Sequence, residues 1–122
     1  MKKSISTLKK KLWKEFSIFI RTRDNWICFT CGRKAEGSGL HAGHFISKAV
    51  GGLALYFDEE NVNAQCYNCN INLGGNIWEY GQRLGKEKVD SLYKKKLLYT
   101  KWSIEDYENK IKYYKEKNEN LR

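Results

Sequence analysis

The chain has 122 residues, enough for one small domain with a limited hydrophobic core. Its four cysteines fall into two CxxC pairs, no apolar signal segment opens the sequence, and no apolar run is long enough to span a membrane. These features argue against a secreted disulfide protein and against a membrane partner. They favour a cytoplasmic protein with reduced thiols.

The net charge of +9 is unevenly distributed. Residues 1–27 carry +6 (8 basic and 2 acidic side chains), residues 28–80 carry −2 (3 and 5), and residues 81–122 carry +5 (12 and 7). Two basic arms suit a polyanion such as nucleic acid, and the slightly acidic centre suits a divalent cation. Lysine-rich helices that are merely soluble would give the same pattern, so charge alone leaves both interpretations open.

The first expected element is an amphipathic helix over residues 1–25. Apolar side chains recur there at helical spacing and predict its buried face: Leu8, Leu12, Phe16 and Phe19. Ser6 or Thr7 is the expected cap at its start. The lysines of this helix either touch phosphates or form a solvated face.

Two short strands are expected next, over residues 40–46 and 62–65, with a turn at residues 36–39 before the first. Residues 47–60, between the strands, are expected to be irregular. Three helices should follow: residues 76–85, with Asn76 and Glu79 as a capping pair; residues 86–98, burying Val89, Leu92 and Leu97; and a helix from Ser103, capped with Asp106.

The two CxxC pairs are Cys28 with Cys31 and Cys66 with Cys69. Each pair offers two sulfurs from one tight turn, so together they can close one tetrahedral four-thiolate zinc site. A structural Zn²⁺ would offset the small core and hold two distant segments together. The segment between the pairs, which contains both histidines, would become a loop fixed at both ends.

The residues around these cysteines resemble the HNH nucleases, also called ββα-metal or His-Me finger nucleases. His44 ends a predicted strand, Asn61 lies five residues before Cys66, and Asn70 directly follows Cys69. The wider pattern, over about residues 8–100, is similar to the phage NinG (Rap) recombination endonucleases. The matching segments are residues 20–24 (IRTRD), 42–47 (AGHFIS), 61–66 (NVNAQC), 69–70 (CN) and 75–76 (GN).

The resemblance implies an α+β fold in a single nuclease domain over residues 1–122. A small zinc-stabilised ββα-metal (HNH) core would cover residues 26–85. A basic N-terminal helix over residues 1–25 and C-terminal helices over residues 86–122 would flank it. The implied activity is metal-dependent endonuclease cleavage of DNA phosphodiester bonds, on branched or single-stranded recombination intermediates of a phage in the cytoplasm of its bacterial host.

His44 is the expected general base. An imidazole with an ordinary pKa near 6.5 can be neutral at working pH and take a proton from water. Asn61 is expected to orient that imidazole, as the middle residue does in the family. The alternatives are a histidine satisfied in the core and an ordinary turn asparagine.

A catalytic Mg²⁺ or Mn²⁺ is the expected second metal. In much of the HNH family one ligand directly precedes the base, where this chain has Gly43. His41 lies on the same side of the strand but about 6.6 Å back, a gap that a β-bulge at Gly43 could close. His41 and Asn70 are therefore the expected ligands, with Asn76 as a competitor. The alternatives are an exposed His41 and a helix-capping Asn76.

DNA is the expected partner, through these basic side chains: Lys9, Lys10, Lys14, Arg21, Arg23, Lys48 and Arg83. Three tryptophans either stack on unpaired bases or belong to the core: Trp26, Trp78 and Trp102. Two other functions stay open: a zinc-stabilised DNA-binding module that does not cut, and an HNH nuclease acting on duplex DNA of the homing or packaging type. A homodimer would suit a symmetric junction, although the sequence does not indicate the oligomeric state.

Overall fold

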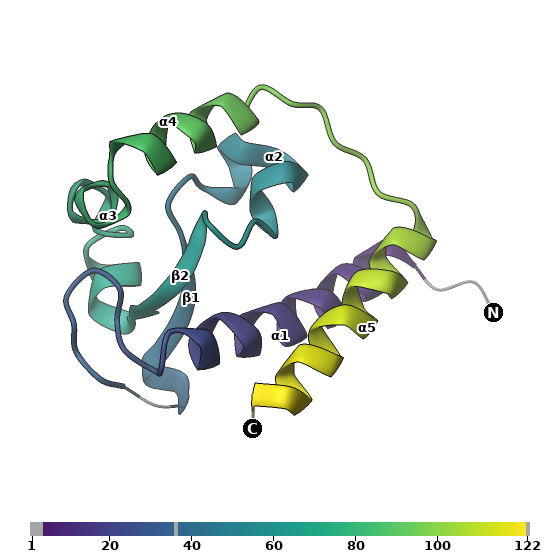
Figure 1. The fold of residues 1–122 in the computed structure, drawn as a ribbon, viewed down its shortest axis with the longest axis horizontal. Coiled ribbons are helices and arrows are strands. Elements are labelled where there is room, and N and C mark those ends of the chain that lie inside the picture. Colours follow the sequence, from purple (N-terminus) through teal and green to yellow (C-terminus); the bar gives the residue numbers. More distant parts are fainter. Residues whose placement is uncertain (1–3, 36, 122) are drawn as a thin grey trace.

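Two antiparallel strands lie at the centre of the fold (Figure 1). The computed structural model describes residues 4–35 and 37–121, and pairs β1 (Leu40–His44) with β2 (Val62–Cys66). The two strands pair residue for residue, from Leu40 opposite Cys66 to His44 opposite Val62. The β-bulge considered for Gly43 is therefore not formed. Since two strands alone are marginally stable, helices must cover both sides of this hairpin.

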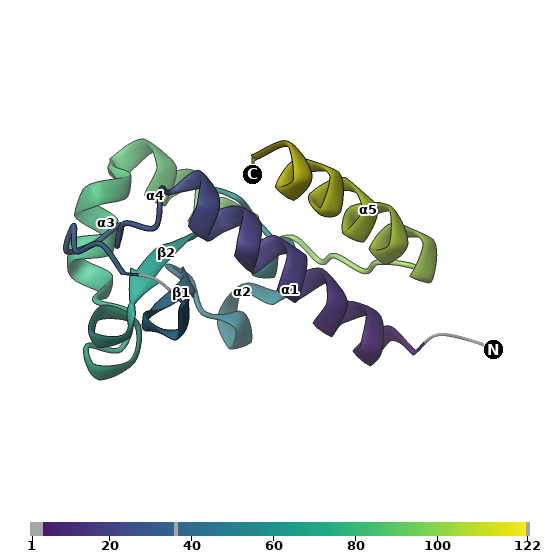
Figure 2. The ribbon, with the colours of Figure 1, turned by 90° about the horizontal axis from the view of Figure 1, so that it is seen from below.

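Helix α1 (Ile5–Arg23) packs against one side of the hairpin, with α5 (Ile104–Leu121) beside it (Figures 1 and 2). The predicted apolar face of α1 is confirmed, since its members are all buried: Leu8, Leu12, Phe16 and Phe19. They pack with Ala42 of β1 and Val62 of β2. From α5, Tyr107, Ile111 and Tyr114 complete this first core.

The helix caps agree only in part with the sequence. Helix α5 has the predicted reciprocal cap: the Ser103 N–H donates to Asp106 Oδ2 (2.8 Å) and the Asp106 N–H donates to Ser103 Oγ (3.1 Å). Helix α1 is capped by Ser4, whose Oγ accepts from the Thr7 N–H (3.1 Å), so Ser6 and Thr7 lie inside the first turn. The part of the predicted helix at residues 1–3 lies outside the described residues.

Residues 47–60 are not irregular as predicted, because they contain helix α2 (Lys48–Tyr56). The helix is kinked at Gly52, whose φ of +63° is easily adopted only by glycine. Leu55 is fully buried, and Gly51 packs so closely on Leu55 and Ile46 that a Cβ would clash. Tertiary packing therefore stabilises a helix whose two glycines weaken the local signal.

The other side of the hairpin is covered by α3 (Ile77–Leu84) and α4 (Lys86–Lys95), close to α2 (Figure 1). A second core forms there from Phe45, Ile46, Leu55, Tyr80, Leu84 and Leu92. The predicted burial of Leu97 is wrong: α4 ends at Lys95, and Leu97 is 80% exposed in the segment that leads to α5. Among the described helices, none has the length and apolar character needed to cross a membrane.

Candidate metal centre and catalytic cavity

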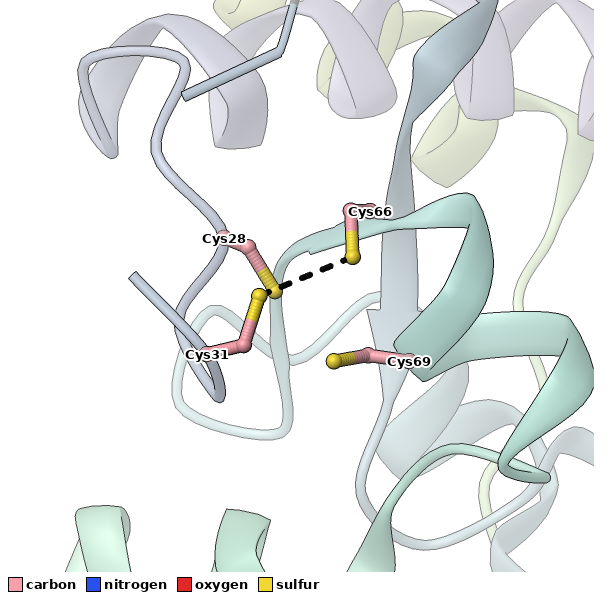
Figure 3. Close-up of side chains that lie close together, drawn as sticks. All are labelled: Cys28, Cys31, Cys66 and Cys69. Carbon is pink, nitrogen blue, oxygen red and sulfur yellow. Dashed lines mark hydrogen bonds between the residues drawn. The ribbon is translucent and has the colours of Figure 1, made fainter. Parts of the chain in front are cut away.

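Four cysteine sulfurs meet at one end of the hairpin (Figure 3). Cys28 and Cys31 come from the loop after α1, Cys66 ends β2, and Cys69 lies in the single π-helical turn η2 (Asn68–Asn72). The four Sγ atoms lie within 4.8 Å of one another, with 3.7 Å between Cys31 and Cys66. A tetrahedral ZnS₄ site with bonds of about 2.3 Å has edges of about 3.8 Å. The predicted cluster is confirmed and could hold a metal such as zinc.

Backbone and hydroxyl groups favour the thiolate of Cys28, whereas burial raises the pKa of Cys31 and of Cys69. The Phe29 N–H donates to Ala64 O (2.7 Å), which attaches the first pair to β2. Burial opposes ionisation of Cys28, but hydrogen bonds from the Thr30 hydroxyl and from backbone groups of the cluster outweigh it and lower the Cys28 pKa to about 6. Ligation requires deprotonated sulfur, so these contacts favour metal binding.

His44 is held at the end of β1 by contacts from the two helices α1 and α2. Its Nε2 lies 2.9 Å from the carbonyl oxygen of Tyr56, the last residue of α2. Because a carbonyl only accepts, Nε2 carries the proton in this bond and Nδ1 is the acceptor nitrogen of the neutral ring. The ring also stacks on Trp13 of α1 and meets the edge of Tyr56.

The surroundings of His44 favour its neutral form. Burial is the main cause, and the Lys48 ammonium adds to it; together they lower the His44 pKa from 6.5 to about 4, although the bond to Tyr56 O acts in the opposite direction. A neutral imidazole with an acceptor nitrogen has the protonation state that a general base needs.

Asn61, which is expected to orient the imidazole, bonds to backbone groups of Ile46 and Leu55 and not to the ring itself. Its Oδ1 accepts from the Ile46 N–H (2.8 Å), and its Nδ2 donates to Ile46 O (3.0 Å) and Leu55 O (2.9 Å). The amide thus fixes the backbone next to Tyr56, whose carbonyl holds His44.

The two predicted divalent-metal ligands lie side by side. Asn70 Nδ2 is 2.9 Å from His41 Nδ1, and the edge of His41 meets Tyr67. Both residues line a cavity of about 410 Å³, and Asn70 also lines a cavity of about 320 Å³ that contains His44. Lys48 lines both cavities, so the histidines face two adjoining hollows that share Asn70 and Lys48.

Asn76, considered as a metal ligand or as a helix cap, lies just before α3. It adopts a left-handed conformation (φ +50°) before α3, and its side chain makes no cap bond to that helix. Its Nδ2 instead points to Cys69 Sγ at 3.7 Å. The Asn76 amide is therefore directed to the cysteine cluster.

Several predicted DNA-binding side chains surround these cavities. Lys48 lies over the rings of Trp13 (5.0 Å) and Tyr56 (5.2 Å), and Lys9 lies over Tyr56 (4.3 Å). Arg21 lines the 410 Å³ cavity, and Lys9 and Lys10 line another of about 580 Å³ beside Trp13. Lys14 is exposed on α1. This arrangement places basic side chains on both sides of Trp13.

Two of the predicted phosphate contacts are not supported by the geometry. Arg23 uses its guanidinium within the protein, donating to Asp24, Asn63 and the carbonyls of Glu59 and Val62 at 2.8–3.1 Å. Arg83 pairs with Glu79 on α3. That pair also explains why Glu79 does not form the predicted capping box with Asn76.

The three tryptophans considered as base-stacking or core residues lie in different environments. Trp102 packs on Phe57 and Tyr107 at the core, Trp26 lies under Arg21, and Trp78 is 75% exposed on α3. The tryptophan that touches His44 is Trp13. In the sequence, Trp13 is one more apolar residue of the predicted α1 face. Its position at the edge of that face is the only signal that could have marked it as a residue of the site.

The fold and the site define a small α+β domain with a two-stranded sheet and a four-cysteine cluster able to hold a metal. A family model described as "Bacteriophage Lambda NinG protein" matches residues 1–122, so the chain belongs to the NinG family.

The curated relatives include three proteins named Protein ninG, from Escherichia phage lambda, Escherichia phage 933W and Salmonella phage P22. Each is 30% identical over 118 residues, which is 93% of this chain. The chain spans just over half of their length, 56–57%. No solved structure matches the chain.

Proposed function

We propose that this chain is a metal-dependent endonuclease of the HNH type that hydrolyses DNA phosphodiester bonds. The observation that carries the proposal is the environment of His44. Its Nε2–H is fixed on Tyr56 O, which leaves Nδ1 as the acceptor nitrogen, and it shares a cavity with Asn70. A neutral imidazole held in one orientation beside a polar cavity is suited to taking a proton from an attacking water.

Each residue around the base has a defined task in this proposal. Trp13 excludes water from one face of the ring, and Asn61 fixes the end of α2 that supplies Tyr56 O. Lys48, which lines both cavities, attracts the phosphate. His41 and Asn70 would hold a divalent cation such as Mg²⁺ or Mn²⁺, whose charge stabilises the leaving oxygen.

Both of these candidate ligands are neutral, so we expect weak binding of the divalent ion until DNA phosphate oxygens add to the site. Added EDTA should therefore stop cleavage quickly while a four-thiolate zinc initially stays in place. Zinc content by atomic absorption and cleavage by gel assay, sampled together after EDTA addition, test this difference. Cleavage that survives full removal of divalent ions would contradict the proposed metal dependence.

The deciding experiment is His44→Ala compared with the wild type. We expect the variant to keep its zinc and its DNA affinity and to lose cleavage by at least about 10²-fold, the usual contribution of a general base. Asn72→Ala, an exposed asparagine on η2, serves as a control that should cleave like the wild type. If wild type and variant both bind DNA and neither cuts it, the chain is a zinc-stabilised DNA-binding module.

We propose branched or single-stranded recombination intermediates of a phage as the substrate. The basic side chains beside Trp13 and the exposed Trp78 supply phosphate contacts and a surface on which an unpaired base can stack. A cleavage assay on four-way junction, single-stranded and linear duplex DNA of the same sequence tests this choice. Preferential cutting of the duplex would instead indicate a nuclease of the homing or packaging type.

A further inference from the structure

Gln65 is a fully buried polar residue whose oxygen lacks a partner. It lies on β2, 0% exposed, and its Nε2 donates to Gly75 O (2.7 Å) and Thr30 Oγ1 (3.2 Å). Among the described residues, only Gln65 Oε1 and Asn118 Oδ1 are buried side-chain polar atoms without a hydrogen bond. An unpaired buried oxygen is costly, so a partner for Gln65 Oε1 is expected.

The Gln65 oxygen occupies space that exists because residue 43 is glycine. A Cβ built on Gly43 would overlap Gln65 Oε1 and lie 3.1 Å from Asn70 Oδ1. His41, which pairs with Gln65 across the strands, bonds to the same Asn70 amide. Two carboxamide oxygens from separate segments therefore converge beside the residue that precedes His44.

A hydrogen bond fixes the Gln65 amide with its oxygen toward Gly43, and the Asn70 oxygen lies on the same side. Rotating the Gln65 amide by 180° would place its oxygen against Gly75 O, and two acceptors repel. Asn70 donates its Nδ2 to His41 Nδ1, which leaves Oδ1 on the Gly43 side. A pair of acceptor oxygens held in this way attracts a cation, because carboxamide oxygens are ligands that hard divalent cations prefer.

We propose that Gln65 Oε1 and Asn70 Oδ1 together bind the divalent cation. In this arrangement Gln65 takes the ligand position given to His41 above, and His41 becomes a positioning residue that holds Asn70. The proposal deepens the proposed nuclease function, on which its catalytic consequence rests. The HNH-family ligand that directly precedes the base has no counterpart at Gly43, and in this proposal Gln65 of the neighbouring strand takes its place. It also gives Gly43 a physical role, since any side chain there would displace the Gln65 oxygen.

The cysteine cluster is connected to this site through Thr30. The Thr30 hydroxyl accepts from Gln65 Nε2 and lies 3.4 Å from Cys28 Sγ, to which it can donate. Gly75, which accepts from Gln65, donates its own N–H to Cys69 O (2.9 Å). The orientation of Gln65 therefore depends on the fold around the four cysteines.

The test uses Mn²⁺ as the probe on the zinc-loaded protein. In the unmodified chain, Mn²⁺ should broaden the side-chain amide NMR signals of Gln65 and Asn70 and leave those of Asn118 sharp. This measurement needs no substitution, so a variant that folds poorly cannot obscure it. Broadening confined to other residues, or none at millimolar Mn²⁺, would overturn the proposal.

Variants then measure the contribution of the oxygen by electron paramagnetic resonance of free Mn²⁺. Gln65→Leu should weaken Mn²⁺ binding by at least about 10-fold, the usual effect of removing a partner from a metal site. Gly43→Ala should do the same with Gln65 still present. Asn118→Leu is the matched control, because Asn118 is a second buried amide with an unpaired oxygen, located between α1 and α5. Zinc content and the melting temperature identify variants that do not fold.

The outcomes separate this proposal from the nuclease function. If Mn²⁺ binds at Gln65 and Asn70 but no DNA is cut, the cation site stands and the proposed function fails. If cleavage requires Mn²⁺ and His44 but Gln65→Leu binds Mn²⁺ like the wild type, the function stands and Gln65 is not a ligand.

Discussion

The imidazole of His44 is stacked on the indole of Trp13, with ring centroids 5.2 Å apart and planes inclined by 15°. The stacking covers one face of the ring, while Tyr56 supplies both an edge contact and the carbonyl that accepts from Nε2–H. The first helix thus contributes directly to the state of a histidine on β1. This relationship leads to the first two predictions.

The first prediction concerns pH. The pKa of His44 in the folded chain should be about 4, and about 6.5 in the unfolded chain. Between these values the unfolded state binds a proton that the folded state does not. The contribution of His44 to folding stability is therefore intact above about pH 6.5 and decreases as the pH falls toward 4. NMR titration of the ring protons gives the pKa, and urea unfolding at pH 7 and pH 5 gives the stability difference.

Two variants are controls for this pH effect. His44→Gln should reduce the loss of folding stability between pH 7 and pH 5 by the part that comes from protonation of His44. Lys48→Met should raise the His44 pKa by removing a nearby positive charge. A titration midpoint near 6.5 in the folded wild type would show that the ring is not desolvated.

The second prediction compares two tryptophans. Trp13→Ala should lower the free energy of unfolding by about 3 kcal/mol and raise the His44 pKa, because the ring then faces water. Trp78→Ala, at a position 75% exposed, should change stability by no more than about 0.5 kcal/mol and leave His44 unaffected. Denaturant melts and the His44 titration in both variants provide the measurement. Equal effects in the two variants would argue against the stacking.

The third prediction concerns Asn61. Asn61→Ala removes three buried hydrogen bonds to Ile46 and Leu55 and should destabilise the chain by about 3 kcal/mol. The end of α2, which carries Tyr56 O, should loosen, so the His44 ring should lose its fixed orientation. Hydrogen exchange of the Ile46 amide and the line width of the His44 ring signals measure these two effects. A stable variant with an unchanged His44 ring would show that Asn61 does not orient the ring through the end of α2.

The fourth prediction concerns the cysteine cluster. Cys66→Ser should lose the bound metal and unfold the surroundings of η2. Cys66 is buried, and the other three cysteines of the cluster are already used as ligands, so none can replace it. We expect a metal content near zero and a melting temperature lower by more than about 10 °C, given the large share of metal binding in the stability of small domains. A Cys66→Ser protein that melts like the wild type would mean that the cluster holds no structural metal.

The fifth prediction separates two kinds of basic residue. Arg23→Gln should cost about 3 kcal/mol of stability, because the guanidinium holds the Glu59 and Val62 carbonyls, and should leave the salt dependence of DNA binding unchanged. Lys10→Gln should leave stability within about 0.5 kcal/mol and reduce the salt slope by about 1. Binding titrations at several salt concentrations and urea melts test both. A reduced slope in Arg23→Gln would restore Arg23 as a phosphate contact.

Local patterns predicted much of the fold because their physical basis is local. The apolar spacing of α1, the strands flanked by CxxC pairs, and the Ser103–Asp106 cap each depend on residues close together in the chain. Helix α2 was missed since its two glycines lower helix propensity and its stability comes from burying Leu55. Leu97 was misplaced because its helix stops where the chain leaves toward α5.

The candidate site also has parts that were predictable from the sequence and parts that were not. The sequence alone determined that four cysteines could share one metal, because this follows from the spacing of the CxxC pairs. The resemblance to the HNH nucleases implied that His41 and Asn70 would be neighbours, and they are. Only the tertiary structure decided that Trp13 covers His44, that Asn61 bonds to the backbone next to Tyr56, and that the Gln65 oxygen lies beside Gly43. Those contacts join different elements, and such contacts depend on how helices and strands pack, which local spacing does not encode.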